Sequence, residues 1–401
     1  MAHDSSVIIR VRARCMSRTL THLESNTNSR NFVSERLTLR ALEIDFRTDT
    51  RWQSFVEAHP NGTIYHSPLW LDVLEKEYGH KTIALVCENG DGELRALLPL
   101  VYTKGLPLHI GGQSGARRLS SLPRTPFGGP LSLDRLASAV VLRAAIERVK
   151  HDPRLRLQVK THEEGLDKLA DGLVCKPWRL TYVLELPNRR EDLLFGSSRN
   201  RNRIRWAVHK ATREGVQVRA AETPEELRAW YELYLDTMRR NVVPPRPRRF
   251  FENLWNSMYA AGFMQLLLAE QVSGAGKRLV AGSIFLMFGQ TMSYAFNGAR
   301  RKDLSLRPND AILSFAILHA RDAGFHLLDF GEVPAGHTRL AEFKSKWGSK
   351  PRQLVRYYYP ASSEAVSEQP DGYAYRLAQT VWQKLPLRTT AMLGDWFYAH
   401  L

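Results

Sequence analysis

The amino-acid sequence predicts an α+β protein built from two similar halves. Segments with the 3.6-residue apolar repeat of helices alternate with short apolar runs typical of strands, and tight turns between the strands favour mostly antiparallel pairing. The same order, two helices, strands, a helix and a strand, occurs twice along the chain. The 401 residues also exceed what one ordinary core requires.

The first predicted domain covers residues 37–190 and follows a loose N-terminal arm at residues 1–36, which shows no clear periodicity. Ser67 and Pro68 suit an N-cap and a first helical residue. An Asn-Gly-Asp-Gly turn at 89–92 between two apolar runs predicts a hairpin. The expected elements are helices within 51–60 and 66–80, the hairpin at 81–103, a helix within 128–150 and a strand at 156–162.

The second predicted domain covers residues 191–360, with the seam between the halves near 186–196. Residues 361–401 are expected to form a polar linker and an amphipathic helical tail rich in Trp, Leu and Tyr. The expected elements of this half are helices at 225–240 and 248–262, three strands within 263–299, a helix at 307–324 and a strand at 325–333.

The composition is that of a folded protein with a strongly basic surface. Lys and Arg outnumber Asp and Glu by 57 to 41, which gives a formal charge of +16 and a pI near 9.9. This balance favours an anionic partner, such as nucleic acid, a phosphate compound, coenzyme A or a membrane surface, although solubility alone is an alternative explanation. No secretory signal and no run of about 18 apolar residues is evident, so we expect a cytoplasmic protein, with a possible peripheral seat at the inner face of the membrane.

A dense basic segment lies at the start of the second half. Its cations are Arg199, Arg201, Arg203, Arg205, Lys210 and Arg213, with no acid among residues 199–213. Arginine suits phosphate because its planar fork donates two parallel hydrogen bonds. The segment therefore predicts a phosphate-binding helix for a lipid-linked sugar, tRNA or coenzyme A, with Arg201, Arg205 and Lys210 as candidates. The alternative is a solvated basic helix.

A second candidate for anion binding is the loop that leads into the helix near Pro308. Arg307 and Asn309 flank this start, where free backbone amides and the helix dipole attract negative charge. An ordinary proline-started helix is the alternative explanation.

The third candidate lies in residues 327–348, "LLDFGEVPAGHTRLAEFKSKWG". Asp329 and Glu332 are candidates to accept a proton from an attacking amine. Lys344 follows Phe343 and precedes Trp347 by three residues, and a lysine there can stabilise a developing carbonyl anion or hold a phosphate. Surface acids and an exposed helical lysine are the alternatives. The three cysteines lie far apart, no histidine pair has ligand spacing, and no metal is expected.

Taken together, these segments resemble the FemAB-like branch of the GNAT-fold acyltransferases over residues ~45–400. The stretches that carry the resemblance are "FVEAHPNGTIYHSPLWLDVLEKEYGHK", "SLPRTPFGGPLS", "RNRIRWAVHKATREGV", "VAGSIFLMF", "LDFGEVPAG" and "FKSKWG". The tail, "VWQKLPLRTTAMLGDWFYAHL", is similar to FemAB-related proteins found with exopolysaccharide export systems.

The resemblance implies two GNAT-like domains in tandem, each a mixed, mostly antiparallel sheet flanked by helices. Family members move an aminoacyl group from aminoacyl-tRNA to the amine of a lipid-linked peptidoglycan precursor. It places Lys344 at the reaction centre, with Phe343 and Trp347 shaping the pocket, and Arg201 and Arg205 on acceptor phosphates. No tightly bound cofactor is implied; aminoacyl-tRNA or acyl-CoA is the co-substrate.

Two departures from the family pattern leave the substrates open. Members that act on lipid-linked peptidoglycan precursors usually carry a lysine near the position of Leu74. Its absence weakens the transfer of a peptidoglycan substrate to this chain, so the expected acceptor is either a peptidoglycan precursor or another amino sugar or polysaccharide precursor, lipid-linked or nucleotide-linked. The glycine loop with which GNAT enzymes bind acetyl-CoA is absent from "RRKDLSLRP". An acetyl-CoA-dependent N-acetyltransferase acting on amino sugars is the first alternative, and a non-catalytic scaffold that binds RNA or an anionic surface is the second.

Overall fold

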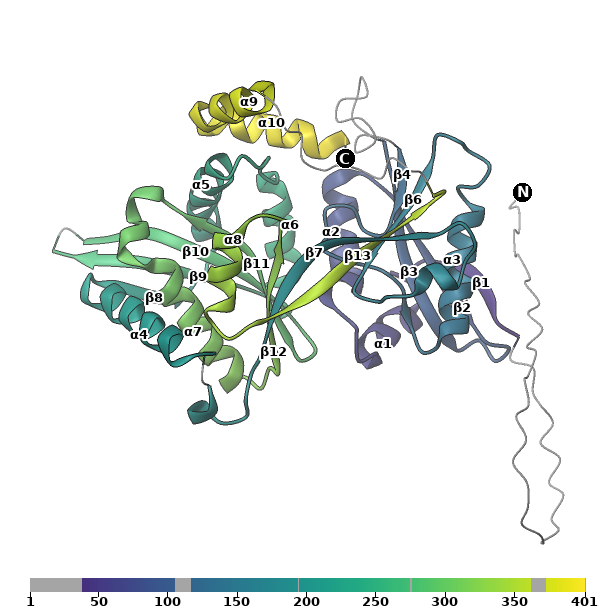
Figure 1. Cartoon of the computed structure of the whole chain (residues 1–401), viewed down its shortest axis with the longest axis horizontal. Coiled ribbons are helices and arrows are strands. Elements are labelled where there is room, and N and C mark those ends of the chain that lie inside the picture. Colours follow the sequence, from purple (N-terminus) through teal and green to yellow (C-terminus); the bar gives the residue numbers. More distant parts are fainter. Residues whose placement is uncertain (1–37, 105–116, 194, 275, 362–372, 401) are drawn as a thin grey trace, which may run out of the picture.

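Helices cover both faces of one long mixed sheet, as Figure 1 shows. The structure is a computed structural model that describes residues 38–104, 117–193, 195–274, 276–361 and 373–400. The predicted N-terminal arm and almost all of the predicted linker lie outside these residues. Within them the strands form a single 13-stranded sheet, which confirms the predicted α+β class.

The first half contributes seven strands and three α-helices to this arrangement in the described residues. The strands are β1 (Arg40–Ile44), β2 (Thr82–Glu88), β3 (Leu94–Thr103), β4 (Arg118–Ser120), β5 (Leu131–Ser132), β6 (Arg156–Thr161) and β7 (Val174–Glu185). The helices are α1 (Thr50–Ala58), α2 (Pro68–Tyr78) and α3 (Arg135–Glu147).

The second half and the tail supply the remaining described elements. The strands are β8 (Val216–Ala220), β9 (Met264–Ser273), β10 (Gly276–Phe288), β11 (Thr291–Ala299), β12 (Leu327–Val333) and β13 (Lys350–Tyr359). The helices are α4 (Ser198–Arg213), α5 (Pro224–Arg240), α6 (Arg248–Met258), α7 (Pro308–Asp322), α8 (Thr338–Ser345), α9 (Tyr373–Lys384) and α10 (Leu387–His400).

Local signals in the sequence start and end several of these elements as predicted. The Ser67 side chain accepts a hydrogen bond from the Trp70 amide at the start of α2, and Pro68 occupies the first turn. Strands β2 and β3 pair antiparallel around the predicted turn, with Cys87 opposite Ala96. Pro308 begins α7.

The strand order repeats between the halves and exchanges one strand of each. The sheet runs β1-β2-β3-β4-β6-β13-β7-β12-β11-β10-β9-β8, so β13 lies beside β6 of the first half, and β7 lies beside β12 of the second. The pairs β4–β6 and β11–β12 are parallel, and the other pairs are antiparallel. The sheet is therefore continuous across the predicted seam, and the domain bounds 37–190 and 191–360 stay a prediction.

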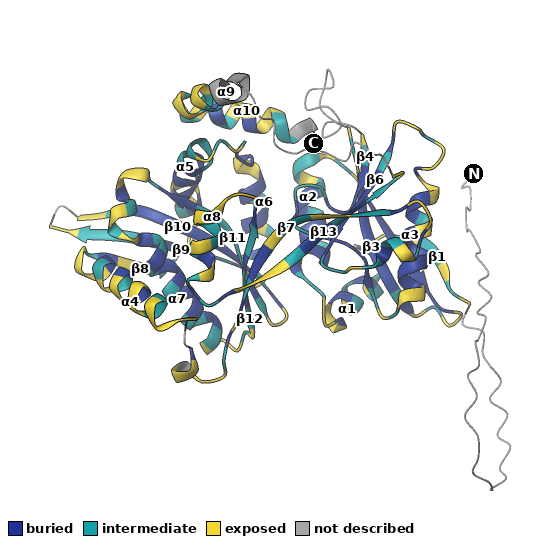
Figure 2. Cartoon of the chain, viewed as in Figure 1, coloured by how far each residue is buried: buried dark blue, intermediate teal, exposed yellow. Residues whose placement is uncertain are grey.

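Three hydrophobic clusters hold the described elements together. One lies on the face covered by α1, α2, α5 and α6 and contains residues of both halves. The second packs α4 and α7 on the strands of the second half, and the third packs α3 on those of the first half. Figure 2 shows the buried residues on the strands and inner helix faces. Because the first cluster crosses the seam, the halves share a core rather than only a linker.

The C-terminal tail lies across α5 (Figure 1). The inner side of α10 includes the buried residues Thr390 and Gly394, and a Cβ on Gly394 would lie 2.4 Å from the Pro245 carbonyl oxygen. Met392 and Trp396 are largely exposed. The tail is therefore helical and leaves apolar side chains exposed, whereas its amphipathic character and its contact with a membrane stay predictions. No helix in the described residues is long and apolar enough to cross a membrane.

Candidate active site

Strands β11 and β12 separate partway along their length and open a cavity in the sheet. They pair in parallel only from Thr291 opposite Leu327 to Ser293 opposite Asp329. Beyond Asp329, β12 shifts its register against β7, and Gly331 adopts a positive φ of 74°. A residue other than glycine would be strained in this backbone conformation. The bulge and the separated strands therefore shape the site from the backbone.

The cavity has a volume of about 730 Å³ and is lined by both halves of the chain. The second half supplies the ends of β11 and β12, α5 and α8, and the first half supplies α2, β6 and the loop after β4. Residues that line it include Trp70, Arg124, Lys160, Tyr234, Arg246, Tyr294, Asn297, Asn309, Asp329, Glu332, Phe343, Lys344 and Tyr398. Five residues proposed from sequence, in three separate segments of the numbering, thus meet in one cavity.

Lys344 is buried at the wall of this cavity, with 5% of its surface exposed. Helix α8 directs its ammonium at the bulge, where Nζ donates to the carbonyl oxygens of Gly331 at 2.9 Å and Glu332 at 3.0 Å. Burial lowers the pKa of Lys344 to about 8, against the opposite effect of Asp329 and Glu332. An ammonium has three donors, and these two bonds leave one for a substrate oxygen.

The two predicted acids lie in the same cavity and have hydrogen-bond partners. One carboxylate oxygen of Asp329 accepts from the Thr181 hydroxyl at 2.7 Å and from the Gly331 amide at 2.8 Å. Glu332 pairs with Arg179 at 2.9 Å. Both acids are half-buried beside the lysine. The arrangement places one hydrogen-bond donor, Lys344, and two potential proton acceptors, Asp329 and Glu332, around one cavity.

The two predicted aromatic residues separate in the structure. Phe343 lines the cavity. Trp347 is completely buried in the second hydrophobic cluster, edge-on to Phe195 with 5.6 Å between ring centroids, and it does not line the cavity. Its position indicates that Trp347 supports the wall from behind.

The predicted phosphate-binding residues also fall into two groups. Arg201, Arg205 and Lys210 lie on α4, outside the lining of the large cavity, and none of them forms an ion pair among the described residues. Arg307 and Asn309 line a smaller cavity of about 310 Å³ at the start of α7. Asn309 and Phe343 line both cavities, which places the smaller one next to the larger.

Exposed Trp206 joins these two groups on the surface. Its ring lies 5.2 Å from the Arg307 guanidinium carbon and 5.7 Å from Lys210 Nζ. The side of the protein that carries α4 is therefore basic and has an aromatic ring on it, which suits an anionic ligand with flat groups.

Sequence reasoning missed the buried cations on the first-half side of the cavity. Lys160 Nζ donates to the carbonyl oxygens of Leu122 at 2.5 Å and Thr125 at 2.6 Å. Arg246 Nη1 donates to the Tyr78 hydroxyl at 2.9 Å. Neither Lys160 nor Arg246 was given a role from the sequence, because the burial of both depends on contacts between distant segments.

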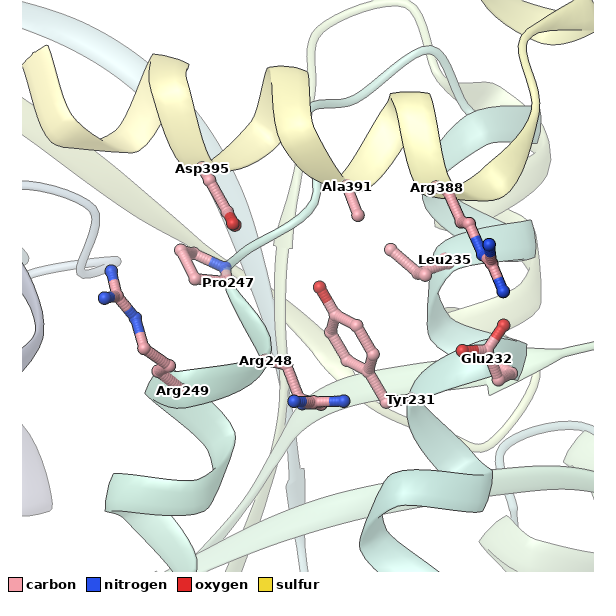
Figure 3. A pocket seen from close by; sticks show the side chains of 9 residues that line it. All are labelled: Tyr231, Glu232, Leu235, Pro247, Arg248, Arg249, Arg388, Ala391 and Asp395. Carbon is pink, nitrogen blue, oxygen red and sulfur yellow. The ribbon is translucent and has the colours of Figure 1, made fainter.

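A second cavity of about 800 Å³ lies beneath α10 (Figure 3). Its lining residues are Tyr231, Glu232, Leu235, Pro247, Arg248, Arg249, Arg388, Ala391 and Asp395. Arg248 and Arg249 pair with Glu252 and Glu77, each at 3.4 Å. The cavity contains no residue proposed from sequence, and acids of the same chain offset its cations. We therefore assign the chemistry to the cavity around Lys344.

No group of three or more potential metal ligands occurs in the part of the chain that the structure describes.

Residues 198–345 match the family model described as an acetyltransferase (GNAT) domain. A curated relative, a UDP-N-acetylmuramoylpentapeptide-lysine N(6)-alanyltransferase from Weissella viridescens, is 26% identical over 163 residues. The match spans 40% of this chain and 46% of that enzyme, so about half of the relative's length is matched.

Solved structures share the fold over most of the chain. The crystal structure of FemX superposes with a TM-score of 0.61 at 18% identity, covering 84% of this chain and 99% of FemX. The C-terminal domain of a putative lysylphosphatidylglycerol synthetase from Agrobacterium fabrum gives a TM-score of 0.53 at 11% identity, covering 83% and 95%. These comparisons confirm the resemblance predicted from the sequence.

Proposed function

We propose that this FemAB-like acyltransferase of the GNAT fold transfers an aminoacyl or acyl group to an amine of a cell-envelope precursor, either of peptidoglycan or of an exopolysaccharide. The observation that carries the proposal is the position of Lys344, buried where β11 and β12 separate, with its ammonium at the cavity. The alanyltransferase activity in the name of the curated relative supports an aminoacyl group and a peptidoglycan precursor.

The geometry supports a direct transfer. The acceptor amine attacks the carbonyl carbon of the donor, a new C–N bond forms, and negative charge develops on the carbonyl oxygen. The remaining N–H of Lys344 stabilises that oxygen. Asp329 or Glu332 accepts the proton that leaves the amine. The C–O bond to a tRNA ribose, or the C–S bond to coenzyme A, then breaks, and the leaving oxygen or sulfur takes up the proton that the carboxylate accepted. Positioning of the two substrates contributes the rest of the rate.

A transfer assay with two donors tests this proposal. The full chain is incubated with UDP-N-acetylmuramoyl-pentapeptide and, in parallel, alanyl-tRNA or acetyl-CoA, and the products are measured by mass spectrometry. We expect an amide product with the mass of one added alanyl group. An amide is also expected from a glucosamine-containing polysaccharide precursor if the acceptor is an exopolysaccharide. If no acceptor gains mass from either donor while RNA still binds, the protein is a scaffold and the proposal is wrong.

The acetyl-CoA-dependent reaction is the second candidate. The GNAT acetyltransferase match over residues 198–345 favours it, and so does the smaller cavity at the start of α7, with Arg203, Arg307 and Arg339 in its lining. Asp310 in the first turn of α7, which pairs with Lys346, opposes an anion there. A product that carries an acetyl group in the assay above would select this reaction.

The proposed role of Lys344 predicts how activity changes with pH. Because the ammonium form donates to the developing oxyanion, kcat/KM should fall about tenfold per pH unit above about pH 8, where the lowered pKa of Lys344 lies. Lys344→Arg should move this decline to higher pH. A pH-rate profile measured with saturating donor checks both expectations.

Unfolding does not account for such a decline, because the sign of the stability effect is opposite. Between the folded pKa of about 8 and the ordinary value of 10.5, the unfolded chain binds more protons at Lys344 than the folded chain does. The contribution of this residue to the free energy of unfolding therefore rises with pH across that window. A flat profile from pH 7 to 10 would contradict the role of the ammonium.

A further inference from the structure

Arg124 occupies a strained and tightly held loop at the first-half side of the cavity. It lies after β4 with a φ of 63°, and Leu122, two residues earlier, has a φ of 48°. Neither residue is a glycine, so both backbone conformations are unfavourable. Strain of this kind persists where surrounding contacts enforce it, and it is concentrated at functional sites.

Side chains from distant segments enforce this conformation. Lys160 binds the carbonyl oxygens of Leu122 and Thr125. The Trp70 indole donates to the Thr125 hydroxyl at 3.2 Å. Arg246 donates to the Arg124 carbonyl oxygen. The loop is thus fixed on both sides of Arg124, and Arg124 lines the cavity.

The guanidinium of Arg124 has no hydrogen-bond acceptor in the described residues. Its Nε, Nη1 and Nη2 are each buried, and none has a partner. Its contacts are the ring faces of Tyr78, at 4.2 Å, and Tyr398, at 5.5 Å. Burial and the charge of Arg246 lower its pKa to about 10, with Tyr78 acting in the opposite direction. A buried charge without a partner is unfavourable, and a bound anion would remove that cost.

The surrounding charges indicate that the anion is multiply charged. The positive charges of Arg356, Arg246 and Arg124 repel the Lys160 ammonium, and the negative charge of Glu332 attracts it. Lys160 and Arg246 bind loop carbonyl oxygens, which do not neutralise them. The guanidinium fork of Arg124 matches two oxygens of one phosphate, and Arg124 lines the cavity beside the stacked rings of Tyr78 and Tyr398.

We propose that Arg124 recognises a phosphate or diphosphate group of the acceptor, beside Arg246 and under Tyr398 of α10. The contacts of Arg124 come from α2, α10 and the segment before α6, while α7 and α8 form the Lys344 end of the cavity. The phosphate-bearing part of the acceptor is thereby assigned to the first-half side of the cavity. The inference rests on the proposed function, since it names the chemical class of that acceptor.

Calorimetry with inorganic pyrophosphate and with UDP tests the site without any transfer reaction. We expect saturable binding of both to the full chain, and a loss of at least about tenfold in affinity in Arg124→Met, because charge-assisted hydrogen bonds are lost. Arg124→Lys should lie between the two, since it keeps the charge and loses the fork. Arg388→Met, in the cavity beneath α10, is the matched control and should bind as the unmodified chain does.

Thermal unfolding separates a binding role from a structural one. Without ligand, Arg124→Met should raise Tm by about 2–4 °C, because it removes a buried cation that has no hydrogen-bond partner. Pyrophosphate should raise the Tm of the unmodified chain and leave that of Arg124→Met unchanged. A fall in Tm of Arg124→Met, with unchanged pyrophosphate affinity, would show that Arg124 only packs against Tyr78 and Tyr398, and would overturn the proposal.

Three further outcomes keep this inference distinct from the proposed function. Lys344→Met should bind pyrophosphate normally, so a failure to find transfer with any donor leaves the phosphate site standing if binding depends on Arg124. If Arg124→Met instead weakens the binding of coenzyme A and leaves that of UDP unchanged, the residue belongs to the donor and the assignment to the acceptor is wrong. Absence of any pyrophosphate or UDP binding to the unmodified chain would also overturn it.

Discussion

Replacing Lys344 by methionine is expected to lower kcat for acyl transfer by about 10²–10³-fold, the usual effect of removing one oxyanion donor. The residue is buried at the cavity and binds the carbonyl oxygens of Gly331 and Glu332, so the bulge itself holds its ammonium in place. Methionine has similar volume but no donor. Steady-state kinetics with the donor and acceptor identified by mass spectrometry measure the change.

Two controls separate chemistry from folding in this experiment. The lost hydrogen bonds leave two carbonyl oxygens without the ammonium, at a cost of about 1–3 kcal/mol each where they are buried, so unfolding curves must show that the variant is folded at the assay temperature. Lys350→Met removes an exposed lysine six residues later and should leave kcat unchanged. If Lys344→Met retains full kcat, Lys344 has no part in the transfer step.

Trp347→Ala is expected to lower the free energy of unfolding by about 3–5 kcal/mol, the range for truncating a large buried aromatic residue. The side chain is completely buried and packs edge-on against Phe195. Lys346 Nζ also lies 5.4 Å from the Trp347 ring centroid. Denaturant unfolding followed by circular dichroism measures the loss.

The conservative change at the same position tests whether Trp347 acts only through packing. Trp347→Phe should restore most of the stability and keep kcat/KM close to that of the unmodified chain, because Trp347 does not line the cavity. A variant that unfolds normally but has lost tenfold or more in kcat/KM would instead show that Trp347 shapes the pocket, as the family resemblance implies.

The repeated order of elements was readable in the sequence because each element carries a local signal. The cap at Ser67 and the Asn-Gly-Asp-Gly turn act within a few residues, and both occur in the structure as predicted. The exchange of β7 and β13 was not readable, because it depends on pairing between strands far apart in the chain. Lys350 lies opposite Val183, and Tyr359 lies opposite Leu157. No local pattern in either segment identifies the strand with which it pairs.

The same distinction applies to the candidate site. Asp329 and Glu332 were proposed as proton acceptors near the end of a predicted strand, and Lys344 for its aromatic neighbours and the family resemblance. The structure brings all three to one cavity. Arg124 and Lys160 were missed because an arginine in a proline-containing loop and a lysine in a strand usually point to solvent. Their burial follows from packing between segments, which residue type and spacing do not reveal.

The exchange of β7 and β13 also sets the order in which the protein can be completed during synthesis. Strand β6 ends at Thr161, and its neighbour β13 begins at Lys350, so a ribosome adding about 5–20 residues per second leaves that edge without its native partner for roughly 10–40 s. An unpaired edge is a template for aggregation. A premature stop codon anywhere before β13 would therefore leave both halves with an incomplete sheet, including a chain whose residues up to Trp347 are all present.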